Sequence, residues 1–194
     1  MSNDGQEKPN SLIARLAKAK HCCVIAMKKI SNFFLFSLII LIIISRIIPH
    51  PHNFTPIISF AIMGSWLFQN QMKTIILTFI IMVTSDLILG FYENIFYVYA
   101  TLLLVILFFA KNKNYNYKNL ILKGFLGSLI FFVITNLCVW IFEDTYSKNF
   151  SGILSCYINA IPFFKNTLIS TVLFNYIIFY IFKKQIKNFK KVIY

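Results

Sequence analysis

The stretch FFLFSLIILIIISRIIPHPHNFTP, residues 33–56, decides the fold class because it joins a long apolar run directly to a polar turn. Residues 33–48 carry a single charge, Arg46, and approach the length of about 20 residues that crosses a bilayer. No cleavage site of small residues follows them, so we expect a permanent helix and not a signal peptide. The prolines and histidines of residues 49–56 predict a turn at the membrane surface.

Composition extends this interpretation to the whole chain. The 194 residues are 58% hydrophobic and only 13% charged, with a mean hydropathy of +0.72. A soluble domain of this size would expose too much apolar surface. A disordered chain would be more polar and would have fewer aromatic residues than this one, which has 22 phenylalanines. Six glycines and four scattered cysteines exclude collagen-like and disulfide-scaffold classes. A helical membrane protein remains.

Six apolar segments follow one another along the chain, which predicts an all-α bundle of six transmembrane helices. They are residues 33–48, 54–68, 72–89, 94–110, 120–142 and 163–182. The second is short for a hydrocarbon core about 30 Å thick at about 1.5 Å per residue. A re-entrant second segment is therefore the alternative to a full crossing.

The distribution of cations favours six crossings. Sixteen of the nineteen lysines and arginines share one side if every segment crosses, and only Arg46, Lys148 and Lys165 lie on the other. By the positive-inside rule both termini are then cytoplasmic, in a multi-pass protein of the plasma (inner) membrane. Residues 1–30 form a basic cytoplasmic segment, 31–184 the transmembrane domain and 185–194 a basic tail. The lysines report orientation, so a nucleic-acid partner is not expected.

Polar side chains, which are costly inside a bilayer, gather at the outer helix ends in this topology. Residues at steps of four form partly polar stripes on the third, fifth and sixth segments. We interpret the cluster as a pocket open to the outside, with Trp140 stacking on a ring-bearing ligand and residues 49–53 and 143–161 forming a lid. The candidate substrate-binding residues are Arg46, His50, Asn53, Asp86, Asn136, Trp140 and Asn166.

Each candidate also has a structural interpretation. Arg46 and Asp86 would form an interhelical ion pair that only holds helices together. Asn136 and Asn166 would be hydrogen-bonding links between helices, and Trp140 would belong to an interfacial aromatic belt.

Known catalytic and cofactor motifs do not occur in the sequence. It has no phosphate-binding G-x-x-x-x-G-K-[ST] loop, dinucleotide G-x-G-x-x-G, H-E-x-x-H or G-x-S-x-G pattern. His50 and His52 alone are too few ligands for a metal site. We therefore expect a protein that is not an enzyme and binds no cofactor or metal. Energy for any transport would come from an ion gradient or from partner proteins.

Several strings resemble an uncharacterised bacterial integral membrane protein family, a domain of unknown function. They are R-x-x-P-H-P-x-N-F-T-P from residue 46, S-D-L-x-L-G from 85, T-N-x-x-x-W from 135 and I-P-F-F-x-N-T from 161, with Tyr146, Gly152 and Tyr157. The resemblance covers approximately residues 35–180. The six-helix layout is similar to the substrate-binding S components of energy-coupling factor (ECF) vitamin transporters, an analogy of size and topology.

This similarity implies a protein that captures a small molecule, such as a vitamin or cofactor precursor, from the outer side. A membrane coupling subunit and ATPases would then drive uptake. Small residues, Ala61 to Ser65 on the second segment or Gly124 and Gly127 on the fifth, would pack on that subunit or within the protein itself. The alternative functions are a structural or interaction protein without transport activity, and a membrane enzyme that uses His50, His52 and Asp86.

Overall fold

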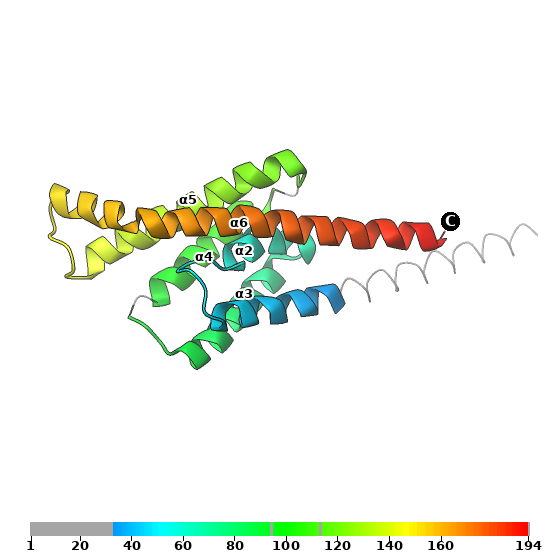
Figure 1. Cartoon of the computed structure of the whole chain (residues 1–194), viewed down its shortest axis with the longest axis horizontal. Coiled ribbons are helices and arrows are strands. Elements are labelled where there is room, and N and C mark those ends of the chain that lie inside the picture. Colours follow the sequence, from blue (N-terminus) through cyan, green and yellow to red (C-terminus); the bar gives the residue numbers. More distant parts are fainter. Residues whose placement is uncertain (1–32, 94, 113, 194) are drawn as a thin grey trace, which may run out of the picture. The chain divides into compact units, whose positions relative to one another are not determined.

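The computed structural model describes residues 33–93, 95–112 and 114–193, with side chains as far as Gln185. In these ranges the protein is all-helical, without strands. The helices are Phe33–Ile47, α2 (Ile57–Leu67), α3 (Gln71–Leu89), α4 (Ile95–Ala110), α5 (Tyr117–Phe142) and α6 (Phe150–Ile193), as Figure 1 shows. The prediction of an all-α protein is confirmed.

Among the described residues, three helical stretches are long and apolar enough to cross a membrane: Gln71–Leu89, Tyr117–Phe142 and Phe150–Gln185. The helices Phe33–Ile47, Ile57–Leu67 and Ile95–Ala110 are apolar but shorter. With 11 residues, α2 is about 16 Å long, roughly half the thickness of a bilayer core. The helices therefore fit a membrane protein, whereas six crossings with cytoplasmic termini stay a prediction.

The short helix α2 lies in the core because it is apolar on every face. Its residues from Ile57 to Ser65 are all buried, and it packs on α3, α4 and α5. Small residues permit this close approach. Gly64 lies against the Thr74 side chain, and a Cβ at Gly127 would come within 2.5 Å of the Ile62 side chain. Both glycines therefore pack inside the protein, as the alternative interpretation expected.

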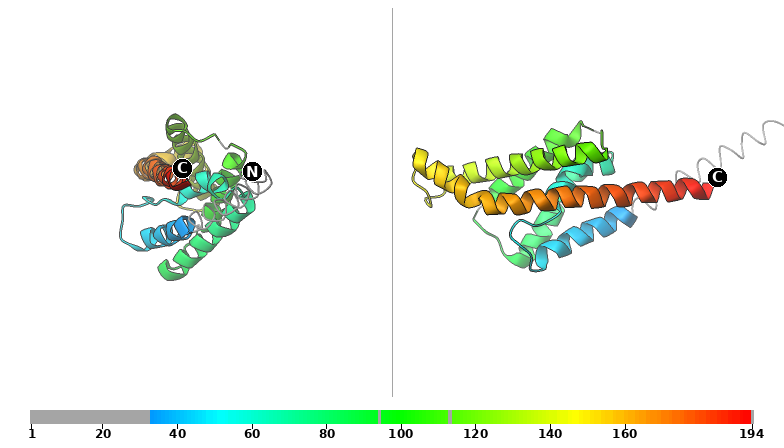
Figure 2. Two further views of the ribbon diagram at one scale, coloured as in Figure 1. Left: turned by 90° about the vertical axis from the view of Figure 1, so that its right-hand side faces the viewer. Right: turned by 45° about the horizontal axis from the view of Figure 1, so that its top comes forward.

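Helices α5 and α6 run side by side as an antiparallel pair (Figures 1 and 2). The stripes of small and polar residues predicted on these two helices meet along this contact. Gly124 packs against Val172, the Ser128 hydroxyl donates to Thr167 O at 3.5 Å, and Asn175 Nδ2 donates to Leu120 O at 3.3 Å. Polar side chains of each helix thus donate to backbone carbonyls of the other, while Asn175 Oδ1 is buried without a partner.

The start of α6 corrects one prediction. Residues 143–161 were expected to form a loop and part of a lid, but the loop ends at Asn149 and α6 begins at Phe150. Asn149 Oδ1 accepts the Gly152 backbone N–H at 2.8 Å and so caps the first turn. Pro162, which directly precedes the predicted segment 163–182, lies inside the helix. A proline removes one intrahelical hydrogen bond, and here it does not end the helix.

Contacts divide the chain into two compact units. The larger, residues 39–179, contains α2 to α5, most of α6 and every residue of the site described below. The described part of the smaller unit is residues 33–38 and 180–193, in which the rings of Phe34 and Phe182 lie 6.0 Å apart.

Candidate functional site

The site is built around an ion pair between two helix ends. Arg46 Nη2, near the end of Phe33–Ile47, lies 2.6 Å from Asp86 Oδ1, near the end of α3. The Tyr99 hydroxyl, on α4, donates to the other carboxylate oxygen at 2.7 Å. The Asp86 side chain is 1% exposed. The cost of burying its charge is offset by two direct partners, Arg46 and Tyr99.

Arg46 is less completely satisfied than its partner. A guanidinium has five N–H donors, and the partners of Arg46 in the described chain are Asp86, the Tyr92 hydroxyl and the Met82 sulfur, a weak acceptor. Its Nε is buried without any hydrogen-bond partner, and the side chain is 11% exposed. Arg46 therefore retains donor capacity that the protein does not use.

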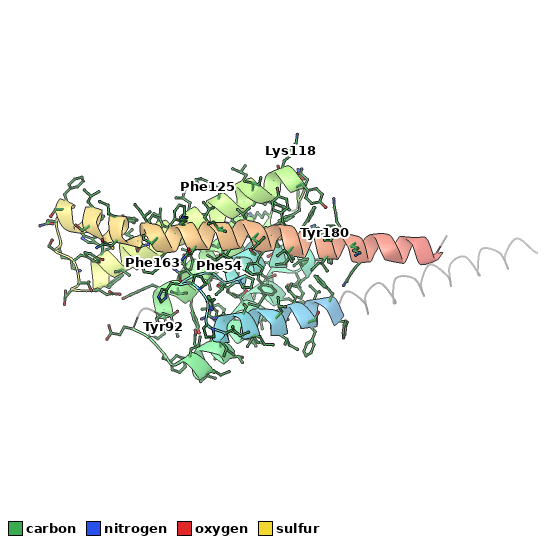
Figure 3. All side chains as sticks on the ribbon, viewed as in Figure 1. Phe54, Tyr92, Lys118, Phe125, Phe163 and Tyr180 are labelled. Carbon is green, nitrogen blue, oxygen red and sulfur yellow. The ribbon has the colours of Figure 1, made fainter. Side chains whose placement is uncertain are left out.

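A cavity of about 390 Å³ lies at this point of the larger unit. The turn after Phe33–Ile47 forms the polar wall of the cavity. The corner between α3 and α4 forms another wall, and α2, α5 and α6 contribute further side chains. Figure 3 marks Tyr92 in that corner. The lining residues are Arg46, His50, His52, Asn53, Thr55, Ile57, Ile58, Leu89, Tyr92, Val98, Phe131 and Thr167.

The turn that lines the cavity is held by α6. Asn166 Nδ2 donates to His52 O at 3.1 Å, and the His52 ring lies edge-on to Phe163 at 5.8 Å. Asn53 has a φ of 62°, a left-handed conformation that asparagine tolerates better than most residues. His50 Nδ1 lies 2.6 Å from Ile48 O, and because a carbonyl only accepts, Nδ1 is the donor. The polar wall is thus a fixed surface.

Tyr92 adds a neutral hydroxyl to this wall from the loop between α3 and α4. Burial raises the pKa of Tyr92, the charge of Asp86 raises it further, and the Arg46 guanidinium opposes both. The tyrosine is therefore protonated at neutral pH and available as a hydrogen-bond donor.

The structure brings some of the predicted binding residues together and separates others. Arg46, His50 and Asn53 line the cavity, and Asp86 and Asn166 support it from behind. The remaining two do not line it. Asn136 Nδ2 donates to Phe132 O of its own helix at 2.7 Å, and Trp140 Nε1 donates to Ser147 O in the α5–α6 loop at 3.0 Å. Their position does not support Trp140 as a stacking platform in this cavity.

Sequence reasoning missed several of the lining and supporting residues. Tyr92 was not among the candidate residues, although its position two residues after Gly90 could have placed it in the same corner as Asp86. Tyr99 and Phe131 gave no signal, because their role depends on which faces of α4 and α5 turn inward. In the described ranges, His, Cys, Asp and Glu side chains form no group of three or more that could hold a metal ion.

Comparison with known families identifies the chain at the level of family. The model described as "Family of unknown function (DUF6580)" matches residues 27–192, so the chain belongs to this family, in agreement with the resemblance seen in the sequence. Neither a curated protein nor a solved structure matches the chain.

Proposed function

We propose that this member of the family of unknown function DUF6580 is a membrane substrate-binding protein. In this proposal it captures a small molecule from the outer side of the plasma membrane. It then hands the molecule to a coupling subunit, and partner ATPases drive its uptake.

The observation that carries the proposal is the cavity beside the Arg46–Asp86 pair. Its volume of about 390 Å³ lies within the range of small-molecule sites, roughly 300–1,000 Å³. Apolar side chains form part of its wall, and a few polar groups converge on it from separate segments, a combination typical of such sites. The guanidinium of Arg46, which lines the cavity, supplies a reason for a ligand to bind there.

The membrane topology in this proposal rests on charge. Sixteen of nineteen cations share one face if the chain crosses six times, and the segment of the cavity turn lies on the other face. Helix α2 is short, but it is buried among α3, α4 and α5, so it need not match the bilayer thickness. The cavity would then open to the outside.

The proposal includes partner ATPases because these 194 residues contain no phosphate-binding loop. The glycines first considered for contact with a coupling subunit are occupied inside the bundle. Such a subunit would have to use another surface.

A cavity-filling variant tests the binding function. Leu89 lines the cavity at the end of α3, whereas Leu87, two residues earlier, is 65% exposed and is not part of the lining. We expect Leu89→Trp to abolish saturable binding to the full chain in phosphatidylcholine nanodiscs, measured by calorimetry over a panel of small metabolites. Leu87→Trp should bind like the wild type. Equal binding by both variants would contradict the proposal.

Uptake requires a second experiment. Cells that produce the chain together with its host's coupling subunit and ATPases should accumulate a bound radiolabelled compound, and the Leu89→Trp variant should not. Accumulation that persists after ATP depletion would contradict the assigned energy source.

A structural role without transport is the second candidate, favoured by the Arg46–Asp86–Tyr99 network. Both carboxylate oxygens of Asp86 are engaged, as they would be in a link that only joins helices. This alternative expects that Arg46 and Asp86 variants change stability and that no small molecule stabilises the protein. A ligand-dependent rise in melting temperature that is lost in Leu89→Trp would exclude it.

A further inference from the structure

The charges around the cavity narrow the class of ligand. Of the described side chains that line it, none is an aspartate or glutamate. Asp86, the carboxylate near it, is 1% exposed and is engaged by Arg46 and Tyr99. A cationic ligand would therefore find no carboxylate to bind, whereas an anionic one would face a guanidinium.

Hydrogen-bond capacity points the same way. Arg46 lines the cavity, and its guanidinium has five donors and no acceptor. The Tyr92 hydroxyl provides another donor, and Asn53 and Thr55 provide groups that can donate. Donors of this kind are satisfied by carboxylate oxygens, and planar guanidinium groups match a carboxylate geometrically.

Other side chains of the lining are apolar. Ile57 and Ile58 of α2, Leu89 and Phe131 present hydrocarbon and one aromatic ring. At about 30 Å³ per water molecule, the cavity has room for about thirteen waters, the size of a small organic molecule. The lining contains one guanidinium, and Asp86 already balances part of its charge. A ligand with one negative charge therefore suits the cavity better than a ligand with two.

We propose that the ligand is a small organic monocarboxylate. Its carboxylate binds to Arg46 and Tyr92, and its apolar body lies against Ile57, Leu89 and Phe131. This inference rests on the proposed binding function and specifies the chemistry of the same cavity.

Matched acids and amides test the inference on the full chain in phosphatidylcholine nanodiscs. The probes are benzoate with benzamide, nicotinate with nicotinamide, and indole-3-acetate with indole-3-acetamide, with benzylamine as a cation. Hydrogen bonds to a charged group contribute about 1.5–3 kcal/mol, so at least one acid should bind about tenfold or more tightly than its amide. Leu89→Trp should abolish this binding.

Variants of the polar wall test whether the preference for acids over amides arises from that wall. Tyr92→Phe, at a 42% exposed position, should reduce the acid-to-amide ratio severalfold. Tyr180→Phe, at a 56% exposed position outside the lining, is the matched control and should leave the ratio unchanged. Arg46→Gln should remove the preference, and its thermal melting curve shows whether the variant is folded. An unchanged ratio in Tyr92→Phe and in folded Arg46→Gln would overturn the inference.

Other outcomes separate this inference from the function on which it rests. If an amide or benzylamine binds as tightly as the acid, and Leu89→Trp still abolishes binding, the carboxylate inference fails and the binding function stands. If no probe binds, the carboxylate inference fails, and a wider metabolite panel without a Leu89-dependent ligand would remove the binding function as well. Palmitate is included as a probe for an acid that the bilayer itself could supply. Binding by palmitate alone would show that the cavity takes a lipid and would overturn the inference of a small monocarboxylate.

Discussion

Two of the described cations in the larger unit are largely buried, and they are accommodated in different ways. Lys123, on α5, is 4% exposed. Its ammonium donates to Asn112 O, Asn112 Oδ1 and Asn114 O at 3.3, 3.2 and 2.8 Å, and lies 3.3 Å from the centre of the Tyr115 ring. Arg46 has one strong acceptor, Asp86, together with the Tyr92 hydroxyl and the Met82 sulfur, and its buried Nε has no partner.

The difference separates a structural charge from one available for binding. An ammonium has three donors, and at Lys123 three oxygens take them. The Tyr115 hydroxyl then donates to Ile62 O at 2.6 Å, which ties the α4–α5 loop to α2. Arg46 instead keeps donors beside a cavity of about 390 Å³. A buried cation with satisfied donors holds the fold, whereas one with unused donors can recognise a ligand.

The largest expected effect comes from removing the partner of Arg46. Asp86→Asn leaves a buried guanidinium without its counter-charge, which typically costs about 3–5 kcal/mol. We expect a loss of that order in the free energy of unfolding, measured by SDS titration in mixed micelles. The double variant Arg46→Met with Asp86→Asn should recover most of it. Wild-type stability of the single variant would show that the pair is not required.

Replacing the other cation should affect stability but not binding. Lys123→Met leaves the oxygens of Asn112 and Asn114 without their donor, so we expect a loss of about 1–3 kcal/mol. Lys118→Met, at an exposed position marked in Figure 3, is the matched control and should change stability by less than about 0.5 kcal/mol. Ligand affinity should be unchanged in both, because neither lysine lines the cavity. Loss of affinity in Lys123→Met alone would refute the division of roles.

Two tyrosines allow the same comparison between a structural residue and a binding residue, with smaller expected effects. Tyr115→Phe removes a buried hydrogen bond to Ile62 O, so it should lower the free energy of unfolding by about 1 kcal/mol. Ligand affinity should be unchanged. Tyr92→Phe should show the reverse, with weaker ligand binding and little change in stability. Equal effects of the two substitutions on unfolding and on calorimetric binding would contradict the comparison.

The smallest expected effect is a dependence of stability on alkaline pH. The pKa of Tyr92 is raised by burial and by Asp86, so the folded state favours the protonated hydroxyl. Its contribution to stability is full below the unfolded pKa of about 10 and is lost as pH rises through the higher folded pKa. Tyr92→Phe should therefore lose less stability than the wild type above about pH 10. Parallel melting-temperature curves for the two proteins would refute this contribution.

The sequence predicted helices better than it predicted contacts. Hydropathy located α3 and α4 to within a residue or two, because a long apolar run has a clear start and end. It missed the first turns of α6, where Ser151, Ser155 and Asn159 interrupt the apolar pattern and Pro162 suggests a helix start. The cap at Asn149 was the signal for the true boundary.

The site was predicted in part for a similar reason. Local sequence shows that Arg46 and Asp86 end their helices, and their pairing was one of the alternatives considered. It does not show which face of α5 turns toward which neighbour. The stripe through Gly124 and Ser128 turns toward α6, so Trp140, at the same spacing, contacts the hairpin loop and does not line the cavity.

Sided cysteine labelling tests the central claim, that the cavity opens on the membrane face opposite the lysine-rich ends. Single cysteines replace His52 or Lys184 in a chain whose four native cysteines are changed to alanine. In intact spheroplasts, a membrane-impermeant maleimide should label His52→Cys, and it should label Lys184→Cys only after permeabilisation. Labelling of both positions from the same side would contradict the outward cavity and the uptake function proposed for it.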